Sequence, residues 1–206
     1  MHPGSTLFFD VGVQRDFFAG GAWPLVSATE AENIASLFAL AAALSIRQGG
    51  SMCLHADAGS GESTPGPHHC VRGTPGAERL PSCRPVLPIE LCEAEASAAA
   101  SALDRAHAFY VTSGCAAAPD ATAAHRRAFG HLTAGVRDAV VFGAGLEYGI
   151  ERAVDALLRH RVRTHVVLDA AAAADASEAQ IVIARWKRRG VDGVTAATLR
   201  RLLVRA

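Results

Sequence analysis

Short apolar runs alternate with longer helical patterns along this 206-residue chain, and the alternation limits its fold more than any other feature. The runs lack polar alternation, which is typical of parallel strands buried on both faces. Helices then cover both faces of the sheet, and right-handed crossovers bring the carboxyl ends of the strands to one edge, where a site is expected. We predict strands at Thr6–Val11, Ser51–Leu54, Ala108–Thr112, Ala139–Phe142, Thr164–Leu168 and Gly193–Thr195, and helices at Ala28–Arg47, Glu93–Arg105, Tyr148–His160 and Ser177–Arg189.

The composition predicts one domain that spans residues 1–206, with a long loop at about 59–88 that is rich in Gly, Pro, Ser and His. Lys and Arg number 20, as do Asp and Glu, so charge gives no reason to expect a nucleic-acid or membrane partner. The apolar run Ile34–Ile46 is too short to span a bilayer, and the first residues lack a secretory signal. Because the 5 cysteines have no regular spacing, we predict a cytoplasmic protein with reduced thiols.

The strand-to-helix turn after Phe142 has the setting of a catalytic nucleophile but lacks the nucleophile. The apolar strand ends in Gly143-Ala-Gly-Leu-Glu-Tyr-Gly149, and an amphipathic helix follows from Glu151. Free backbone N–H groups and the helix dipole can stabilise a thiolate or an oxyanion at such a turn. Gly149 supplies the backbone of this arrangement without a reactive side chain.

Three segments together resemble the isochorismatase-like cysteine hydrolases, a superfamily that includes the nicotinamidases. Gly143–Gly149 is similar to the "GxATDYC" stretch that carries the catalytic cysteine, Leu7–Trp23 to the amino-terminal "DxQxDFxxGGAL" block, and Pro67–Ala77 to the "PPHCVxGTPG" block. The resemblance implies a three-layer α/β/α, Rossmann-like fold with a six-stranded, mainly parallel sheet. It also implies assembly into a homo-oligomer.

The family's catalytic triad of aspartate, lysine and cysteine would fall on Gly12, Ser113 and Gly149 in this chain. None of these three residues supplies the base, the cation or the thiolate that the family uses. Two residues are possible substitutes. Asp10 lies two positions before Gly12 on the predicted strand, and Cys115 lies close to the lost lysine position.

A divalent metal is the one cofactor that the resemblance suggests, through an aspartate and two histidines that suit zinc. Asp57 and His69 match two of these ligands, whereas Gly59 replaces the third. His55 or His68 would have to complete the set. Since two ligands rarely hold zinc, we expect no bound cofactor.

Two hypotheses for function follow. The first is a pseudoenzyme that binds a small molecule or has a structural or regulatory role; the second is an active amidase-type hydrolase with a rewired site. For the first, we expect either a pocket that binds a small anion or a site filled by Phe17 and Trp23. The residues expected to line this pocket are Phe17, Trp23, Gly145, Leu146 and Tyr148.

Overall fold

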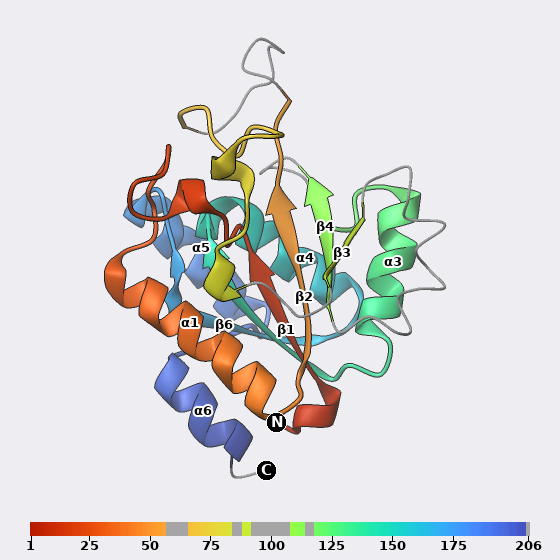
Figure 1. Cartoon of the computed structure of the whole chain (residues 1–206). Coiled ribbons are helices and arrows are strands. Elements are labelled where there is room, and N and C mark those ends of the chain that lie inside the picture. Colours follow the sequence, from red (N-terminus) through yellow and green to blue (C-terminus); the bar gives the residue numbers. More distant parts are fainter. Residues whose placement is uncertain (57–65, 84–87, 92–107, 114–117, 205–206) are drawn as a thin grey trace.

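The sheet is the centre of the computed structural model, which describes residues 1–56, 66–83, 88–91, 108–113 and 118–204 (Figure 1). Seven strands lie in these residues, and every pair of neighbours is parallel. Their order across the sheet is β3-β4-β2-β1-β5-β6-β7. The strands are β1 (Thr6–Val11), β2 (Arg47–Cys53), β3 (Pro88–Leu91), β4 (Ala108–Ser113), β5 (Asp138–Ala144), β6 (Arg163–Ala172) and β7 (Asp192–Val194).

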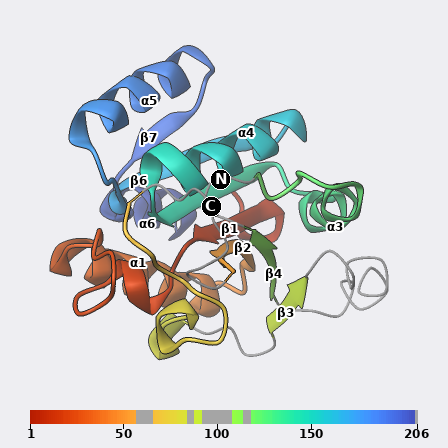
Figure 2. The same cartoon turned by 90° about the horizontal axis from the view of Figure 1, so that it is seen from above.

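Helices cover both faces of this sheet, which confirms the predicted three-layer α/β/α architecture (Figure 2). One layer consists of α1 (Ala28–Ala43) and α6 (Ala196–Val204). The other layer consists of α3 (Ala123–Thr133), α4 (Glu151–Arg159) and α5 (Ala176–Arg188). Among the described residues, no helix has the length and apolar character needed to cross a membrane.

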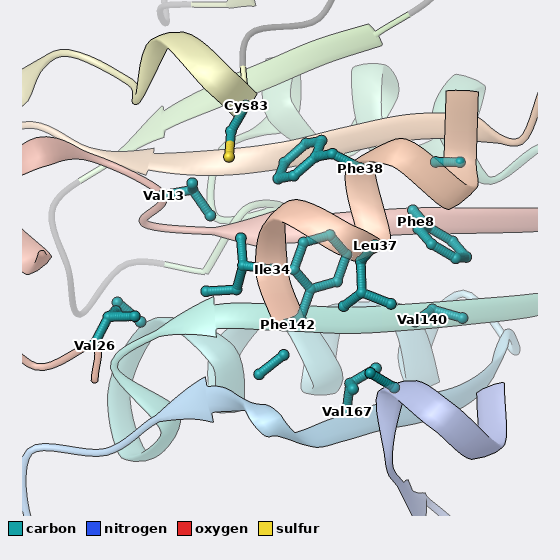
Figure 3. Packing of buried hydrophobic residues seen from close by; sticks show 14 of the residues in the cluster. Phe8, Val13, Val26, Ile34, Leu37, Phe38, Cys83, Val140, Phe142 and Val167 are labelled. Atoms are coloured by element: carbon teal, nitrogen blue, oxygen red, sulfur yellow. The ribbon is translucent and has the colours of Figure 1, made fainter. Parts of the chain in front are cut away.

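Helix α1 begins at a capping box and buries one apolar face. The Ser27 side chain accepts from the Glu30 backbone N–H, and the Glu30 carboxylate accepts from the Ser27 backbone N–H at 2.8 Å. On the buried face, Ile34, Leu37 and Phe38 pack against β1 and β5 (Figure 3). The Phe38 ring meets Phe142 edge-on at a centroid distance of 5.5 Å.

The alternation of side chains along β1 divides this strand between the two helical layers. Leu7 and Phe9 belong to the core under α3, α4 and α5, whereas Phe8 belongs to the core under α1. Asp10 has the same parity as Phe8. Its carboxylate therefore lies on the α1 side of the sheet, together with Arg79 from the loop that follows β2.

Several element boundaries differ from the predictions. The first helix ends at Ala43, not Arg47, because the chain turns through Ser45 at φ 51° and Arg47 already begins β2. The sheet has one strand more than the six predicted: β3, a short edge strand that the sequence pattern did not indicate. Helices α3 and α6 were also not predicted. The helix predicted at Glu93–Arg105 lies outside the described residues.

Candidate functional site

The turn that lacks a nucleophile follows β5 as predicted. Gly145 takes a left-handed conformation at φ 75°, and a π-helical turn from Leu146 to Ile150 leads into α4. The backbone N–H groups of Tyr148 and Ile150 donate to the Gly145 carbonyl at 3.0 and 3.1 Å. The Tyr148 N–H, one of the N–H groups expected to face an anion, is therefore used within the turn itself.

Gly12 is held in a backbone conformation that disfavours any side chain. Its φ is 58°, in the left-handed region, and a Cβ placed there would lie 3.1 Å from Cε2 of Phe17. Phe17 is only 3% exposed, so its ring has little freedom to move away. The position predicted for the family's acid thus has no carboxylate, and a side chain there would be strained and crowded by Phe17.

Three of the residues expected to line the pocket, Phe17, Trp23 and Tyr148, form a chain of ring contacts, whereas Leu146 lies in the core under α3, α4 and α5. Trp23 lies between His69 and Tyr148, with ring centroids 4.7 and 6.1 Å away. Phe17 contacts both Trp23 and His69, at 6.0 and 5.1 Å. The Phe17 ring therefore lies beside Gly12 and Trp23 packs on it, which supports the hypothesis of a filled site.

Asp10, one of the two candidate substitutes named above, is held in a buried ion pair. Nη1 of Arg79 lies 2.8 Å from Oδ1 of Asp10, and the Tyr110 hydroxyl donates to Oδ2 at 3.0 Å. The Arg79 guanidinium also stacks 3.8 Å from the centroid of the Tyr110 ring. Burial raises the pKa of the Asp10 carboxyl, while Arg79 acts in the opposite direction. The Asp10 carboxylate is therefore already bound by two side chains at the α1 face.

A second cluster forms where the long loop returns to the end of β2. Residue 55 pairs with Val71 in a parallel bridge: the His55 N–H donates to the Cys70 carbonyl at 3.1 Å, and the Arg72 N–H donates to the His55 carbonyl at 3.0 Å. This pairing brings the His69 and His55 rings to a centroid distance of 4.8 Å. Cys53 faces both rings because it is two residues before His55 on an extended chain.

The donor atoms of Cys53, His55 and His69 all lie within 4.8 Å of one another. The Cys53 sulfur is 3.0 Å from Nε2 of His55 and 3.8 Å from Nε2 of His69. Nδ1 of His69 donates to the Pro67 carbonyl at 2.6 Å, which leaves the lone pair of Nε2 directed at the sulfur. Burial lowers the pKa of His69 and favours the neutral ring that a metal requires. With Cys53 as a free thiolate this donor set would fit zinc.

The structure brings together only part of the predicted metal set. His55 and His69 meet, whereas His68 is exposed and does not belong to the cluster. Asp57, Gly59 and Cys115 lie outside the described residues. Cys53 was not predicted, although its spacing of two from His55 on a strand is a signal that would have found it.

The thiols also differ from the expectation that all are reduced. Cys53 is disulfide-bonded. Cys70 and Cys83 are free and buried, and burial raises the pKa of both. Neither of these two thiols is therefore an activated nucleophile.

Gln14 fixes the end of β2 through both the nitrogen and the oxygen of its side-chain amide. Its Nε2 donates to the carbonyls of Cys53 and Ala77 at 2.7 and 2.8 Å, and its Oε1 accepts from the Cys53 N–H at 2.7 Å. The side chain is fully buried. Gln14 therefore holds Cys53 and the loop in one arrangement.

We expect Gln14→Leu to lower the free energy of unfolding by about 2–4 kcal/mol, because it removes three buried hydrogen bonds between the Gln14 side chain and the backbone. Urea unfolding followed by circular dichroism measures the change. Gln180→Leu, the same replacement at an exposed position of α5, is the control. Equal effects of the two substitutions would contradict the role given to Gln14.

No family model matches this sequence, and no curated protein matches it. Solved structures do match. A pyrazinamidase from Pyrococcus horikoshii in complex with zinc has a TM-score of 0.65 at 21% identity, covering 93% of this chain and 99% of its own. An isochorismatase family protein from Desulfovibrio vulgaris has a TM-score of 0.67 at 22% identity, covering 96% and 97%.

A ribonuclease from Caenorhabditis elegans also matches, with a TM-score of 0.63 at 12% identity, covering 100% of this chain and 84% of its own. The fold is thus shared by proteins named for different reactions, and the likeness alone does not fix an activity. With the parallel sheet and its two helical layers, these matches show that the chain has the isochorismatase-like fold.

Proposed function

We propose that this protein is a non-catalytic relative of the isochorismatase-like hydrolases, a pseudoenzyme that acts through binding or as a structural or regulatory subunit. The observation that carries the proposal is the state of Gly12. Its left-handed backbone and the Phe17 ring, 3.1 Å from a Cβ placed there, disfavour the acid that would activate a nucleophile.

The two other triad positions support the same proposal. Ser113 ends β4 and offers no cation, and Gly149 offers no thiol. Asp10 is bound to Arg79 and Tyr110, so it would have to break a buried ion pair in order to act as a base. A hydrolase of this type needs all three functions at once.

We further propose that the protein is a cytoplasmic homo-oligomer. In this proposal it carries out no cofactor-dependent reaction. The groups retained at the carboxyl edge are those that hold the loop: Gln14, Asp16 and the pairing at His55. Asp16 accepts from the Cys70 N–H at 2.6 Å and from the Ala22 N–H at 3.0 Å. The hydrogen bonds that hold the loop are present, whereas the catalytic triad is not. This combination supports a binding role over a catalytic one.

We expect no hydrolysis of nicotinamide, pyrazinamide or isochorismate above a buffer blank, with or without added zinc. Release of ammonia measures amide hydrolysis, and an active nicotinamidase serves as the positive control. Turnover that depends on zinc and disappears in His69→Ala would instead favour the rewired hydrolase, for which the Cys53, His55 and His69 cluster is the supporting observation. Turnover lost in Cys115→Ala would favour it too.

We also expect that Gly149→Cys alone does not create activity, because a thiol without a base and a cation is a weak nucleophile at neutral pH. Reaction with a thiol reagent, compared with the unsubstituted protein, would show that the new cysteine is accessible. Mass spectrometry after incubation with nicotinamide would test for an acyl-enzyme. A covalent adduct at residue 149 would show that another group has taken the place of the lost base.

A further inference from the structure

We propose that a hollow between α1 and α6 binds the phosphate group of a small phosphorylated molecule. The hollow has a volume of about 420 Å³ and is lined by Asn33, Ser36, Ala196, Ala197, Arg200 and Arg201. None of these residues belongs to the turn after β5 or to the ring contacts around Trp23. A ligand here goes beyond the proposed function, because the hollow does not depend on the loss of the catalytic triad.

Helical spacing gathers the lining residues into two strips. On α6, the two alanines of the first turn and the two arginines four residues later share one side of the helix. On α1, Asn33 and Ser36 are three residues apart and also lie on one side. The two helices lie side by side over a shared core (Figures 1 and 2). The hollow is therefore the space that these two strips enclose.

Asp169 on β6 holds both walls of the hollow in place. Its backbone carbonyl accepts from Nδ2 of Asn33 at 2.7 Å, and its carboxylate accepts from the Ala196 N–H at 2.8 Å. One residue of the sheet is thereby bound to α1 and to the start of α6. Because the walls are fixed before a ligand arrives, binding has little ordering entropy to overcome.

Two guanidinium groups line the hollow without an acidic partner. In the part of the chain that the structure describes, neither Arg200 nor Arg201 forms an ion pair. Arg201 donates from Nη2 to the Thr198 hydroxyl at 3.1 Å, which leaves its other N–H groups for a ligand. The segment Thr195–Val204 contains no acidic residue. The hollow therefore has two positive charges that no neighbouring side chain neutralises.

The arginines of α5 have the opposite arrangement. Arg185 and Arg189 form ion pairs with Glu151 and Asp155 on α4. Those two cations are thus neutralised within the protein, whereas the two cations of α6 are open to an anion from solution.

The charge of the hollow favours a phosphate over other anions. A phosphate monoester carries about −1.5 to −2 at neutral pH, and its oxygens match the N–H donors of guanidinium groups. A carboxylate or a sulfate ester carries a single negative charge, which leaves one of the two arginines without a partner.

The size of the hollow favours an ester over a free phosphate ion. A water molecule takes up about 30 Å³ in the liquid, so 420 Å³ corresponds to about 14 waters. A phosphate ion has five heavy atoms and would fill only part of this volume. The methyl groups of Ala196 and Ala197 line the hollow and suit an uncharged organic group.

Calorimetric titrations with three probes near neutral pH test the class of ligand. We expect phenyl phosphate to bind, and phenyl sulfate, which has the same shape and one charge fewer, to bind at least about 10-fold more weakly. Inorganic phosphate should also bind more weakly than phenyl phosphate. Equal affinities for phenyl phosphate and phenyl sulfate would overturn the choice of a phosphate. Equal affinities for phenyl phosphate and inorganic phosphate would overturn the choice of an ester.

Substitutions test the position of the site. Arg200→Gln and Arg201→Gln should each weaken the binding of phenyl phosphate by at least about 10-fold. Ala197→Glu places a carboxylate at an exposed position in the first turn of α6, where acids are well tolerated, and should abolish binding. Arg188→Gln, which removes an exposed arginine of α5, is the matched control and should leave the affinity unchanged.

Circular dichroism of each variant shows whether a loss of binding reflects a loss of fold. Unchanged affinity in folded Arg200→Gln and Arg201→Gln would overturn the site, and so would an equal loss in Arg188→Gln. Wild-type protein that does not bind phenyl phosphate would overturn it as well. Assays of amide hydrolysis are independent of these titrations, so a failure of this site and a failure of the proposed function are distinguishable.

Discussion

Asp10→Ala is expected to lower the free energy of unfolding by about 3–5 kcal/mol, because it leaves the Arg79 guanidinium charged and buried without its partner. Arg79 is 5% exposed, and its Nη1 lies 2.8 Å from the Asp10 carboxylate. An arginine cannot escape this cost by losing its proton. Urea unfolding at neutral pH measures the difference.

Replacing the other member of the ion pair, in Arg79→Met, should lower the free energy of unfolding by less than Asp10→Ala does. In Arg79→Met the remaining Asp10 can become protonated, since burial raises the pKa of its carboxyl. The double variant Asp10→Ala/Arg79→Met should be more stable than Asp10→Ala alone, because no buried charge remains. Equal losses in both single variants would show that packing, and not the unpaired charge, sets the cost.

The sheet and its layers were predictable because buried parallel strands have a strong local signature. The fully buried runs of β1 and β5 are examples. The end of α1 could not be predicted, because Ala42, Ala43 and Leu44 continue a helical composition up to the turn at Ser45. The short edge strand β3 has too few residues for a periodic pattern to be resolved.

The site was predictable only where a single motif contained its residues. The loop motif pointed to His69, and the first strand pointed to Gly12. The partner of Asp10 is 69 residues away in the sequence, and no local spacing predicts such a pairing. Gly12 has φ 58°, and its N–H donates at 3.0 Å to the carbonyl of Ser51, a distant residue that local spacing does not predict either.

Gly143→Ala is expected to cost more than about 4 kcal/mol and to leave little folded protein at 25 °C. Gly143 pairs with Val11 at the ends of β5 and β1, and a Cβ there would lie 1.9 Å from the Val11 carbonyl oxygen. Its φ is 131°, a conformation that essentially only glycine adopts. Because the contact is with backbone, no side-chain rotation relieves it.

Gly135→Ala separates the two causes of this loss. Its φ is 73°, also in the left-handed range, but a Cβ there would meet nothing within 4 Å. We expect that variant to lose only about 1–2 kcal/mol, which is the cost of a left-handed L-residue. The difference between the two variants, measured by thermal and urea unfolding, then combines the clash with the Val11 carbonyl and the less favourable φ of 131° at Gly143. The end of β5 leads directly into the turn at Gly145. A stable Gly143→Ala protein would therefore mean that β1 does not fix this turn. It would also mean that β1 does not support the packing of Tyr148 on Trp23.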